Sequence, residues 1–325
     1  MRSLDVRPVA FPLVKPFAIS RGAVSEVALV EVVIGEAGAR GRGECRPYAR
    51  YDETQESVVA AIEALRAEIE GGLDRAGLRR AMPAGAARNA VDAALIDLEA
   101  KRAGRSAWEM LGLPPPAPVE ITYTIGLDTP DRMAAEAAQV GRPLLKLKLG
   151  GEGDLARVEA VRAAVPEARL IVDANEAWDV GMLDTWCPRM AELGVELIEQ
   201  PLHADRDEAM RGRPRPVPLC ADESCHDRHG LDRLEGLYDC VNVKLDKTGG
   251  LTEAIDLVNE AEARGFGIML GCMMASSLAM APAFLLAGRA RFVDLDAPLL
   301  LARDRDPPFR FEGAVMHPPP AALWG

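Results

Sequence analysis

Apolar and polar positions follow one pattern before residue 113 and another after it. The chain begins with β-prone apolar runs at 4–13 and 27–34, followed by a turn at 38–43 that leads into a third short run. Apolar residues then recur at helical spacing over about 53–80 and again over about 86–103. Strands followed by helices, in a unit of this size, predict an α+β domain.

The Pro-rich segment Leu113-Pro-Pro-Pro-Ala-Pro marks the boundary, and a regular alternation begins after it. Strand-like runs occur at 119–127, 144–149, 170–173, 195–199, 217–221, 240–244, 267–270 and 292–295, with helical segments such as 154–165, 184–193 and 251–264 between them. Eight strands separated by crossover helices predict a parallel barrel rather than an open sheet. No convincing helix follows the eighth strand, and we expect 307–325 to return to the N-terminal unit.

The composition of the chain limits which binding partners and which cellular compartment we expect for the protein. The chain has 325 residues, 49% of them apolar, so it can bury a sizeable core. Its net charge of −12 argues against nucleic acid and against anionic membranes as partners. No apolar run reaches transmembrane length, and the first residues lack the apolar core of a secretory signal. The six scattered cysteines are expected to be reduced thiols of a cytoplasmic protein.

Three carboxylates stand at the ends of three consecutive predicted strands. They are Asp173, Glu199 and Asp222, one for each strand. Strand ends of a β/α barrel meet around one mouth, and a set of carboxylates without histidine or cysteine favours a hard ion, Mg²⁺ above all. Glu223 is adjacent to Asp222 and points the other way along a strand, so Asp222 is the better ligand. The alternative is that each carboxylate caps a helix or pairs with an arginine.

Lysines occur on the second and sixth predicted barrel strands. Lys146 and Lys148 alternate with leucines and therefore share the face toward the barrel interior or its mouth. A lysine that is partly desolvated beside another cation has a lowered pKa and can serve as a base, whereas a salt-bridged pair would need buried carboxylates. Lys244 lies four strands further on, so opposed lysines predict proton removal from one face and return from the other. Lys247 falls past the strand end and is expected to hold the turn.

These residues resemble those of the enolase superfamily, within the muconate-lactonising subgroup, and above all the dipeptide epimerases of the L-Ala-D/L-Glu epimerase family. The resemblance covers nearly the whole chain. Besides the carboxylates and lysines, the motifs that carry it are Ile19-Ser-Arg-Gly, Gly43-Glu-Cys-Arg-Pro-Tyr-Ala-Arg-Tyr, Pro83-Ala-Gly-Ala-Ala-Arg-Asn-Ala, Val172-Asp-Ala-Asn-Glu, Ala221-Asp-Glu-Ser-Cys-His, Asn242-Val-Lys-Leu-Asp-Lys-Thr-Gly-Gly-Leu-Thr-Glu-Ala and Asp294-Leu-Asp.

The resemblance implies an α/β fold in which a capping domain at 1–112 closes over a TIM-like (β/α)₇β barrel at 113–306, with 307–325 returning to the capping domain. It implies Mg²⁺ held by the three carboxylates, with Lys148 and Lys244 as the acid/base pair. Lys146 would lower the pKa of Lys148 and contact the substrate carboxylate.

Further residues are expected to bind the two ends of a dipeptide. Asp294 and Asp296 point to one side of the eighth strand and suit an α-ammonium group, as in the family. Arg21 would bind a side-chain carboxylate, although Arg46 and Arg50 lie in another candidate loop. Thr124 and either Ser276 or Ser277 are expected to line the pocket.

The predicted activity is Mg²⁺-dependent epimerisation of a dipeptide at its C-terminal α-carbon, through an enediolate. The preferred substrate would be L-Ala-D/L-Glu from peptidoglycan turnover. Two alternatives stay open: an o-succinylbenzoate synthase or cycloisomerase of the same superfamily, and a non-catalytic peptide-binding barrel. A homo-oligomer is compatible with the sequence.

Overall fold

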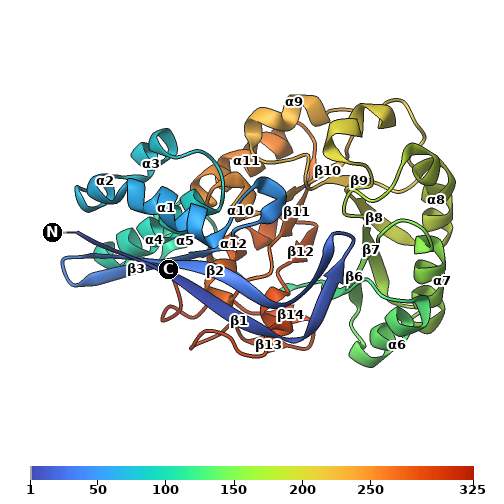
Figure 1. Ribbon diagram of the computed structural model, residues 1–325, viewed down its shortest axis with the longest axis horizontal. Helices are drawn as coiled ribbons and strands as arrows, with labels where there is room; N and C mark the ends of the chain where they lie inside the picture. Colours follow the sequence, from blue (N-terminus) through green and yellow to red (C-terminus); the bar gives the residue numbers. More distant parts are fainter. Residues whose placement is uncertain (1) are drawn as a thin grey trace.

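The computed structural model describes residues 2–325, which form an N-terminal α+β unit and an eight-stranded barrel (Figure 1). The N-terminal unit is an antiparallel sheet in the order β1-β2-β3 with helices packed against it. Its elements are β1 (Ser3–Ile19), β2 (Gly22–Glu36), β3 (Ala39–Cys45), the 3₁₀ helix η1 (Ala49–Tyr51), α1 (Gln55–Ala64), α2 (Arg66–Glu70), α3 (Arg75–Ala81), α4 (Ala86–Ala103) and α5 (Ala107–Met110).

The helical pattern over 53–80 forms three helices, not one. Gly72 has a φ of 103° after α2, a conformation that interrupts a helix. The side chain of Asp74 then accepts a hydrogen bond from the backbone of Gly77 and begins α3. The second predicted helix agrees with α4. A β-carbon on Gly43 would lie 2.0 Å from the carbonyl oxygen of Ala90, so the glycine allows α4 to lie directly on the sheet.

The barrel consists of eight parallel strands in sequential order, and the predicted (β/α)₇β fold with its capping α+β domain is confirmed. Thr122 donates its backbone N–H to the carbonyl of Val293 at 2.9 Å, which brings the first strand against the last. The strands are β5 (Tyr123–Ile125), β6 (Leu144–Lys148), β7 (Arg169–Asp173), β8 (Val195–Glu199), β9 (Leu219–Ala221), β10 (Cys240–Val243), β11 (Gly267–Gly271) and β12 (Phe292–Asp294).

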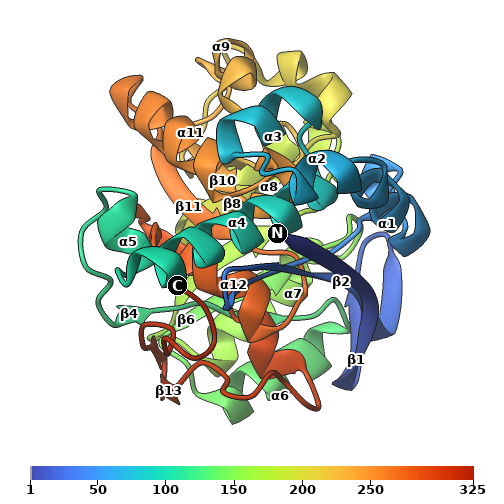
Figure 2. The same cartoon turned by 90° about the vertical axis from the view of Figure 1, so that its left-hand side faces the viewer.

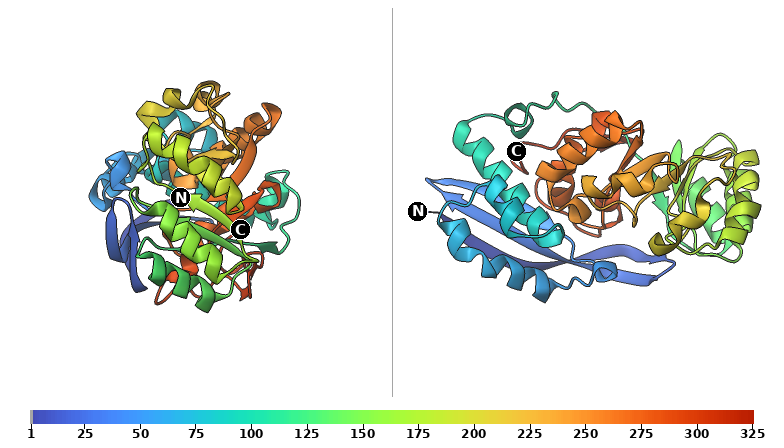
Figure 3. Two further views of the ribbon diagram at one scale, coloured as in Figure 1. Left: turned by 90° about the vertical axis from the view of Figure 1, so that its right-hand side faces the viewer. Right: turned by 90° about the horizontal axis from the view of Figure 1, so that it is seen from above.

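Helices surround most of the barrel, as the views in Figures 1 and 3 show. After the eighth strand the described residues form the short 3₁₀ helix η5 and two short strands, but no α-helix. The connecting elements are α6 (Pro130–Val140), α7 (Asp154–Ala164), α8 (Val180–Glu192), η2 (Ala204–Met210), η3 (Arg228–Gly230), α9 (Leu231–Leu234), α10 (Leu245–Thr248), α11 (Leu251–Ala263), α12 (Ser277–Phe284), η4 (Ala287–Arg289) and η5 (Ala297–Leu300). Within residues 2–325 no helix is both long and apolar enough to cross a membrane.

The strand predicted at 119–127 is divided between two sheets. Its first part, β4 (Val119–Glu120), pairs with β14 (Val315–Met316), which in turn pairs with β13 (Phe311–Glu312), while only β5 joins the barrel. The last residues contact α4: Trp324 donates its indole N–H to the carbonyl of Ala93, and Gly325 donates its backbone N–H to Asp97. In Figure 2 the C-terminus lies beside α4. The boundaries at residues 112 and 306 stay predictions.

The N-terminal unit meets the barrel along the β1–β2 hairpin and through α4. The hairpin extends beside the barrel in Figures 1 and 3. On α4, Arg88 donates to the carbonyls of Thr248 and Gly249 at 2.6 and 3.0 Å, in the turn between α10 and α11. Asp92 accepts the backbone N–H of Thr252 at 3.0 Å. The Thr-Gly-Gly-Leu-Thr motif is thus the part of the barrel that α4 of the capping unit contacts.

Gly250→Ala should therefore destabilise the protein strongly. Gly250 has a φ of 116°, and a β-carbon there would lie 2.5 Å from Oδ2 of Asp92. Backbone strain and overpacking together should lower the free energy of unfolding by roughly 2–5 kcal/mol in urea titrations. Gly265→Ala is the control, because its φ is 85° but nothing lies within 4 Å. If both variants lost the same free energy of unfolding, the close approach of Gly250 to α4 would contribute nothing to the destabilisation.

Candidate active site

Four buried carboxylates and four buried lysines meet where the barrel strands end. Asp173, Glu199 and Asp222 offer oxygens that all lie within 4.8 Å of one another. They stand at the ends of β7, β8 and β9, and their exposed fractions are 2% or less. The fourth carboxylate is Asp294, and the lysines are Lys146, Lys148, Lys244 and Lys247. Each lysine makes at least one ion pair with a carboxylate of this set.

A residue directly after β8 and a residue on β10 fix the carboxylates in place. The amide oxygen of Gln200 accepts the backbone N–H of Asp222 at 2.9 Å, and Asn242 donates to Oε1 of Glu199 at 2.7 Å. Gln200 has a φ of 34° and Asn175 one of 45°, both in the left-handed region that non-glycine residues rarely adopt. Such strained residues concentrate at functional sites, where neighbouring contacts hold them. Neither residue was predicted from the sequence: the role of Gln200 depends on loop geometry, and that of Asn242 depends on a contact between β10 and β8, which are not neighbours in the barrel.

Lys148 and Lys244 contact opposite ends of the carboxylate row. Nζ of Lys148 lies 2.6 Å from Oδ2 of Asp173, and Nζ of Lys244 lies 2.6 Å from Oδ2 of Asp222. Lys148 ends β6 and Lys244 directly follows β10, and three strands, β7 to β9, lie between β6 and β10. Burial lowers the pKa of Lys244, but the charges of Asp222 and Glu199 outweigh it and hold that pKa well above its ordinary value.

Lys146 and Lys247 lie deeper than the other two lysines. Nζ of Lys146 lies 2.6 Å from Oε2 of Glu199 and 2.7 Å from Oδ2 of Asp294, and the residue does not line the cavity. Lys247 was expected to hold a turn. It does donate to the carbonyl of Asn242, but it also contacts Oδ1 of Asp222 at 2.6 Å. Lys247 therefore belongs to the ion-pair network of the site.

The carboxylate set has the chemistry of a divalent-cation site. It offers only oxygen donors, as hard cations such as Mg²⁺ prefer, and its three members come from adjacent rigid strands. Oε2 of Glu199 is fully buried and, although close to Lys146, makes no directed hydrogen bond, so it retains a free lone pair. The residues present fit a divalent ion.

Asp294 and Asp296 occupy different environments at the end of the eighth strand. Asp294 ends β12 and receives hydrogen bonds from Lys146 at 2.7 Å and from the hydroxyl of Thr122 at 2.5 Å. Asp296 lies beyond the strand and accepts the backbone N–H of Thr124 at 2.6 Å. Burial, together with the charge of Asp294, raises the pKa of Asp296 to about 7. The charges of Lys146 and Lys148 outweigh burial at Asp294 and hold its pKa below the ordinary value.

A cavity of about 780 Å³ opens above the carboxylates, between the capping unit and the barrel mouth. Of the residues proposed from the sequence, Ser276 does not line it, because its hydroxyl is turned toward Glu44 and donates to that carboxylate at 2.6 Å. Ser277 is also absent from the lining and contacts Asp304. Those that line the cavity are Arg21, Thr124, Lys148, Asp222, Lys244, Asp294 and Asp296.

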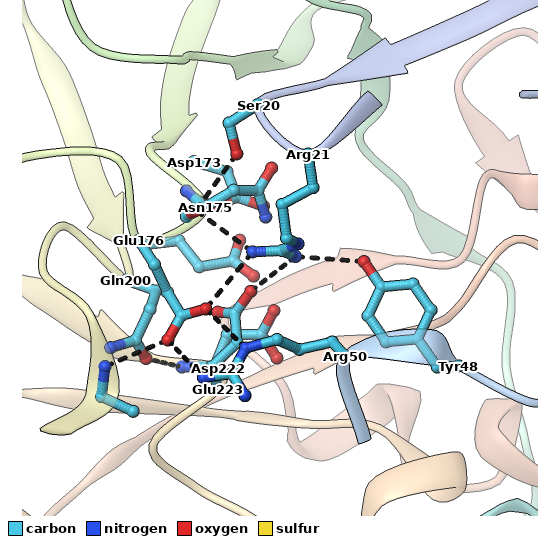
Figure 4. A network of polar contacts seen from close by, with 12 residues as sticks. Ser20, Arg21, Tyr48, Arg50, Asp173, Asn175, Glu176, Gln200, Asp222 and Glu223 are labelled. Carbon is cyan, nitrogen blue, oxygen red and sulfur yellow. Dashed lines mark hydrogen bonds and ion pairs between the residues drawn. The ribbon is translucent and has the colours of Figure 1, made fainter. Parts of the chain in front are cut away.

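The capping unit is tied to the barrel mouth by two arginines (Figure 4). Arg21 lies 2.8 Å from Oε1 of Glu223 and donates to the hydroxyl of Tyr48 at 3.0 Å. Arg50 makes two hydrogen bonds to Glu176, at 2.8 and 2.9 Å. Glu223 therefore pairs with the capping unit, while its neighbour Asp222 joins the carboxylate set, in agreement with the alternation expected along a strand.

Asp246 couples the capping unit to the loop that carries Lys244, and its burial makes stability depend on pH. Burial raises the pKa of Asp246 to about 7. Hydrogen bonds from Asn89 and from the backbone N–H of Arg46 lower this pKa, but burial has the larger effect. An acid with a higher pKa in the folded state binds its proton more tightly when folded. Stability from this group is therefore full below the unfolded-state pKa of roughly 4, and it is lost as the pH rises toward 7.

Asp246→Asn should remove this loss. We expect the wild-type protein to lose about 2–3 kcal/mol more unfolding free energy than the variant between pH 5 and pH 8. Urea titrations of both proteins at the two pH values measure the difference. Parallel pH profiles for the two proteins would show that Asp246 ionises normally.

Comparisons with known proteins identify the family. Residues 1–112 match the mandelate racemase / muconate lactonizing enzyme N-terminal domain, and residues 131–322 match the enolase C-terminal domain-like family. An L-Ala-D/L-Glu epimerase of Escherichia coli is 47% identical over 98% of this chain and 100% of its own length. The chain therefore belongs to the dipeptide epimerase family of the enolase superfamily, and it is an isomerase of the epimerase or racemase class.

Other relatives differ in substrate. An N-acetyl-D-glutamate racemase of Pseudoalteromonas is 44% identical over 91% of this chain and 95% of its own length. A structure from Agrobacterium tumefaciens, an enolase family member with bound sodium and L-Ala-L-Glu, has a TM-score of 0.98 and 49% identity, with 100% of both chains covered. A dipeptide epimerase from Methylococcus capsulatus complexed with Mg and L-Arg-D-Lys has a TM-score of 0.90 and 31% identity, with 98% of this chain and 96% of its own covered.

Proposed function

We propose that this enzyme epimerises a dipeptide at the α-carbon of its C-terminal residue, with L-Ala-D/L-Glu as the preferred substrate and Mg²⁺ as the cofactor. The observation that carries the proposal is the placement of Lys148 and Lys244 at the two ends of the buried carboxylate row, both facing one cavity. The relatives from Escherichia coli and Agrobacterium tumefaciens support the choice of dipeptide.

Asp173, Glu199 and Asp222 would hold the ion. When bound, it would offset their charge and the negative charge that develops on the substrate carboxylate. Lys148 and Lys244 would each serve one epimer: one lysine removes the α-proton, and the other delivers a proton to the opposite face. Lys146 has no access to the cavity in this structure, so we propose that it acts through Glu199 and Asp294, by positioning them.

The substrate's two ends would be bound by groups from different units, one at the end of the eighth barrel strand and one in the capping unit. Asp296, with support from Asp294 and Thr124, would bind the α-ammonium group of a dipeptide. Arg21 stays a candidate for the side-chain carboxylate, although Glu223 already neutralises it.

N-acetylglutamate racemisation is a second candidate, favoured by the 44% identity to the Pseudoalteromonas racemase. Both substrates are glutamates acylated on nitrogen, and they differ in the ammonium group. Asp296 is the residue that would distinguish them.

The test is proton exchange in deuterated water. The Mg²⁺-loaded protein is incubated with L-Ala-L-Glu, L-Ala-D-Glu, N-acetyl-L-glutamate and L-Leu-L-Tyr, and the loss of the α-proton signal and the appearance of the epimer are followed by NMR. The proposal expects the fastest exchange with the two Ala-Glu epimers. Faster turnover of N-acetylglutamate would favour the second candidate, and no exchange with any compound would refute both.

A further inference from the structure

Three buried polar residues of α4 contact the barrel segment that directly follows Lys244. Asn89 donates its side-chain N–H to Oδ1 of Asp246 at 2.8 Å, on the first turn of α10. Arg88 and Asp92 contact later residues of the same segment, which runs from the end of α10 into α11. The capping unit therefore meets the barrel at the segment next to this lysine.

Asp246 is the residue through which this contact reaches Lys244. It lies two positions after Lys244, and its Oδ1 also accepts the backbone N–H of Arg46 at 3.3 Å. Both hydrogen-bond partners that the described part of the chain gives this carboxylate belong to the capping unit. Loss of the Asn89 donor would leave a buried carboxyl group with one long hydrogen bond, which is costly, and we expect the first turn of α10 to shift.

A shift of this segment can reach the substrate through Lys244. Neither Asn89 nor Asp246 lines the cavity, and none of the residues 245–252 does, whereas Lys244 lines it directly. Nζ of Lys244 lies 2.6 Å from Oδ2 of Asp222, at one end of the carboxylate row. The position of α10 therefore sets where this ammonium group stands relative to the cavity.

Lys148 has no corresponding contact with the capping unit. In the described part of the chain, the hydrogen bonds of the loop at 149–153 are all with barrel residues. The carboxylate of Asp154 accepts the backbone N–H of Gly150 at 2.9 Å and the indole N–H of Trp178 at 2.7 Å. The Lys148 loop is therefore fixed to the barrel itself, through the segment that follows β7.

We propose that Asn89, through Asp246, positions Lys244 for proton transfer, so that docking of the capping unit controls one of the two bases and not the other. This proposal rests on the proposed two-lysine mechanism. Displacement of a reacting group by about 1 Å can slow a reaction by roughly 100-fold. Loss of the contact between Asn89 and Asp246 should therefore slow proton removal by Lys244 and leave proton removal by Lys148 nearly unchanged.

The experiment measures α-proton exchange from L-Ala-L-Glu and from L-Ala-D-Glu separately, in the Mg²⁺-loaded protein. The variants Lys244→Met and Lys148→Met show which epimer depends on which lysine. Asn89→Ala tests the proposal. Asp92→Ala is the matched control, because Asp92 is a buried residue of the same helix that contacts α11 rather than α10. Initial rates give kcat and KM for each epimer, and calorimetry gives the affinity for Mn²⁺.

Asn89→Ala should lower kcat about 10- to 100-fold for the epimer that depends on Lys244 and by less than about threefold for the other. KM and the affinity for Mn²⁺ should stay within a few-fold of the wild-type values. Asp92→Ala should change the two epimers by the same factor. The proposal is wrong if Asn89→Ala slows both epimers equally, slows mainly the epimer that depends on Lys148, or acts by weakening ion binding.

A second measurement separates this proposal from the proposed function. If wild-type protein exchanges no proton with either epimer, the proposed function fails. Acetylation of Lys244 relative to Lys148 by acetic anhydride, measured by peptide mass spectrometry, then tests the role of Asn89. Asn89→Ala should change this ratio at least several-fold and Asp92→Ala should not, whereas an unchanged ratio would refute the proposal. If Asn89→Ala does not fold, Asn89→Leu, which fills the space without a hydrogen-bond donor, replaces it in both measurements.

Discussion

Replacing Lys148 or Lys244 with methionine should strongly suppress epimerisation, while each variant keeps proton exchange with a different epimer. The two lysines contact opposite ends of the carboxylate row, so each is expected to reach one face of the α-carbon. A variant with one lysine left can still remove and replace the proton on that lysine's side. It cannot complete inversion, and epimer formation should fall about 10²- to 10⁴-fold.

The measurement is α-deuterium uptake and epimer formation from L-Ala-L-Glu and L-Ala-D-Glu, each followed separately. Lys15→Met is the control, because Lys15 lies on β1 outside the cavity lining and its side chain is half-exposed. If either site variant lost exchange with both epimers equally while retaining Mg²⁺ binding, the assignment of one base to each face would be wrong. If both variants retained inversion, neither lysine would be the base.

The parts of this site that follow from periodicity could be predicted from the sequence. An apolar run that ends in Asp173, Glu199 or Asp222 places the carboxylate at the barrel mouth, because all strands are parallel and their ends converge there. Alternation along a strand likewise places Lys146 and Lys148 on one face, and it separates Asp222 from Glu223. Each inference needed only local geometry and the strand order, and the structure brings these residues together.

The parts that depend on loops could not be predicted in this way. Gln200 orients Asp222 only because its backbone is held at a φ of 34°, which no hydrophobic pattern encodes. Ser276 caps α12 and binds Glu44, a residue 232 positions earlier in the chain, so its direction depends on how the capping unit docks. The pairing of Arg21 with Glu223, 202 positions apart, is also long-range. Sequence spacing identifies candidates for such contacts, but the choice among them depends on docking of the two units.

Removal of the divalent ion should stop turnover and lower thermal stability together. Asp173, Glu199 and Asp222 are present as a cluster in the folded chain, so an ion that binds there stabilises the folded state by roughly 2.7 kcal/mol at a concentration of 100 times its dissociation constant. Chelator-treated protein should therefore show a melting temperature that rises with added Mg²⁺. Epimerase activity should return over the same concentration range.

The variants Glu199→Gln and Glu223→Gln test which of the buried carboxylates bind the ion. Glu199 is the middle carboxylate of the row, so its substitution should weaken Mn²⁺ binding, measured by calorimetry, by at least about 10- to 100-fold and should suppress the Mg²⁺-dependent rise in melting temperature. Glu223 is a buried carboxylate of the same neighbourhood, but its oxygen is 2.8 Å from Arg21 and it lies outside the cluster. Glu223→Gln should keep the ion affinity within a few-fold. If Glu223→Gln weakened ion binding and Glu199→Gln did not, the ion would bind nearer the capping unit than the carboxylates at the strand ends. The ion would then not lie between Lys148 and Lys244, and their proposed roles would be wrong.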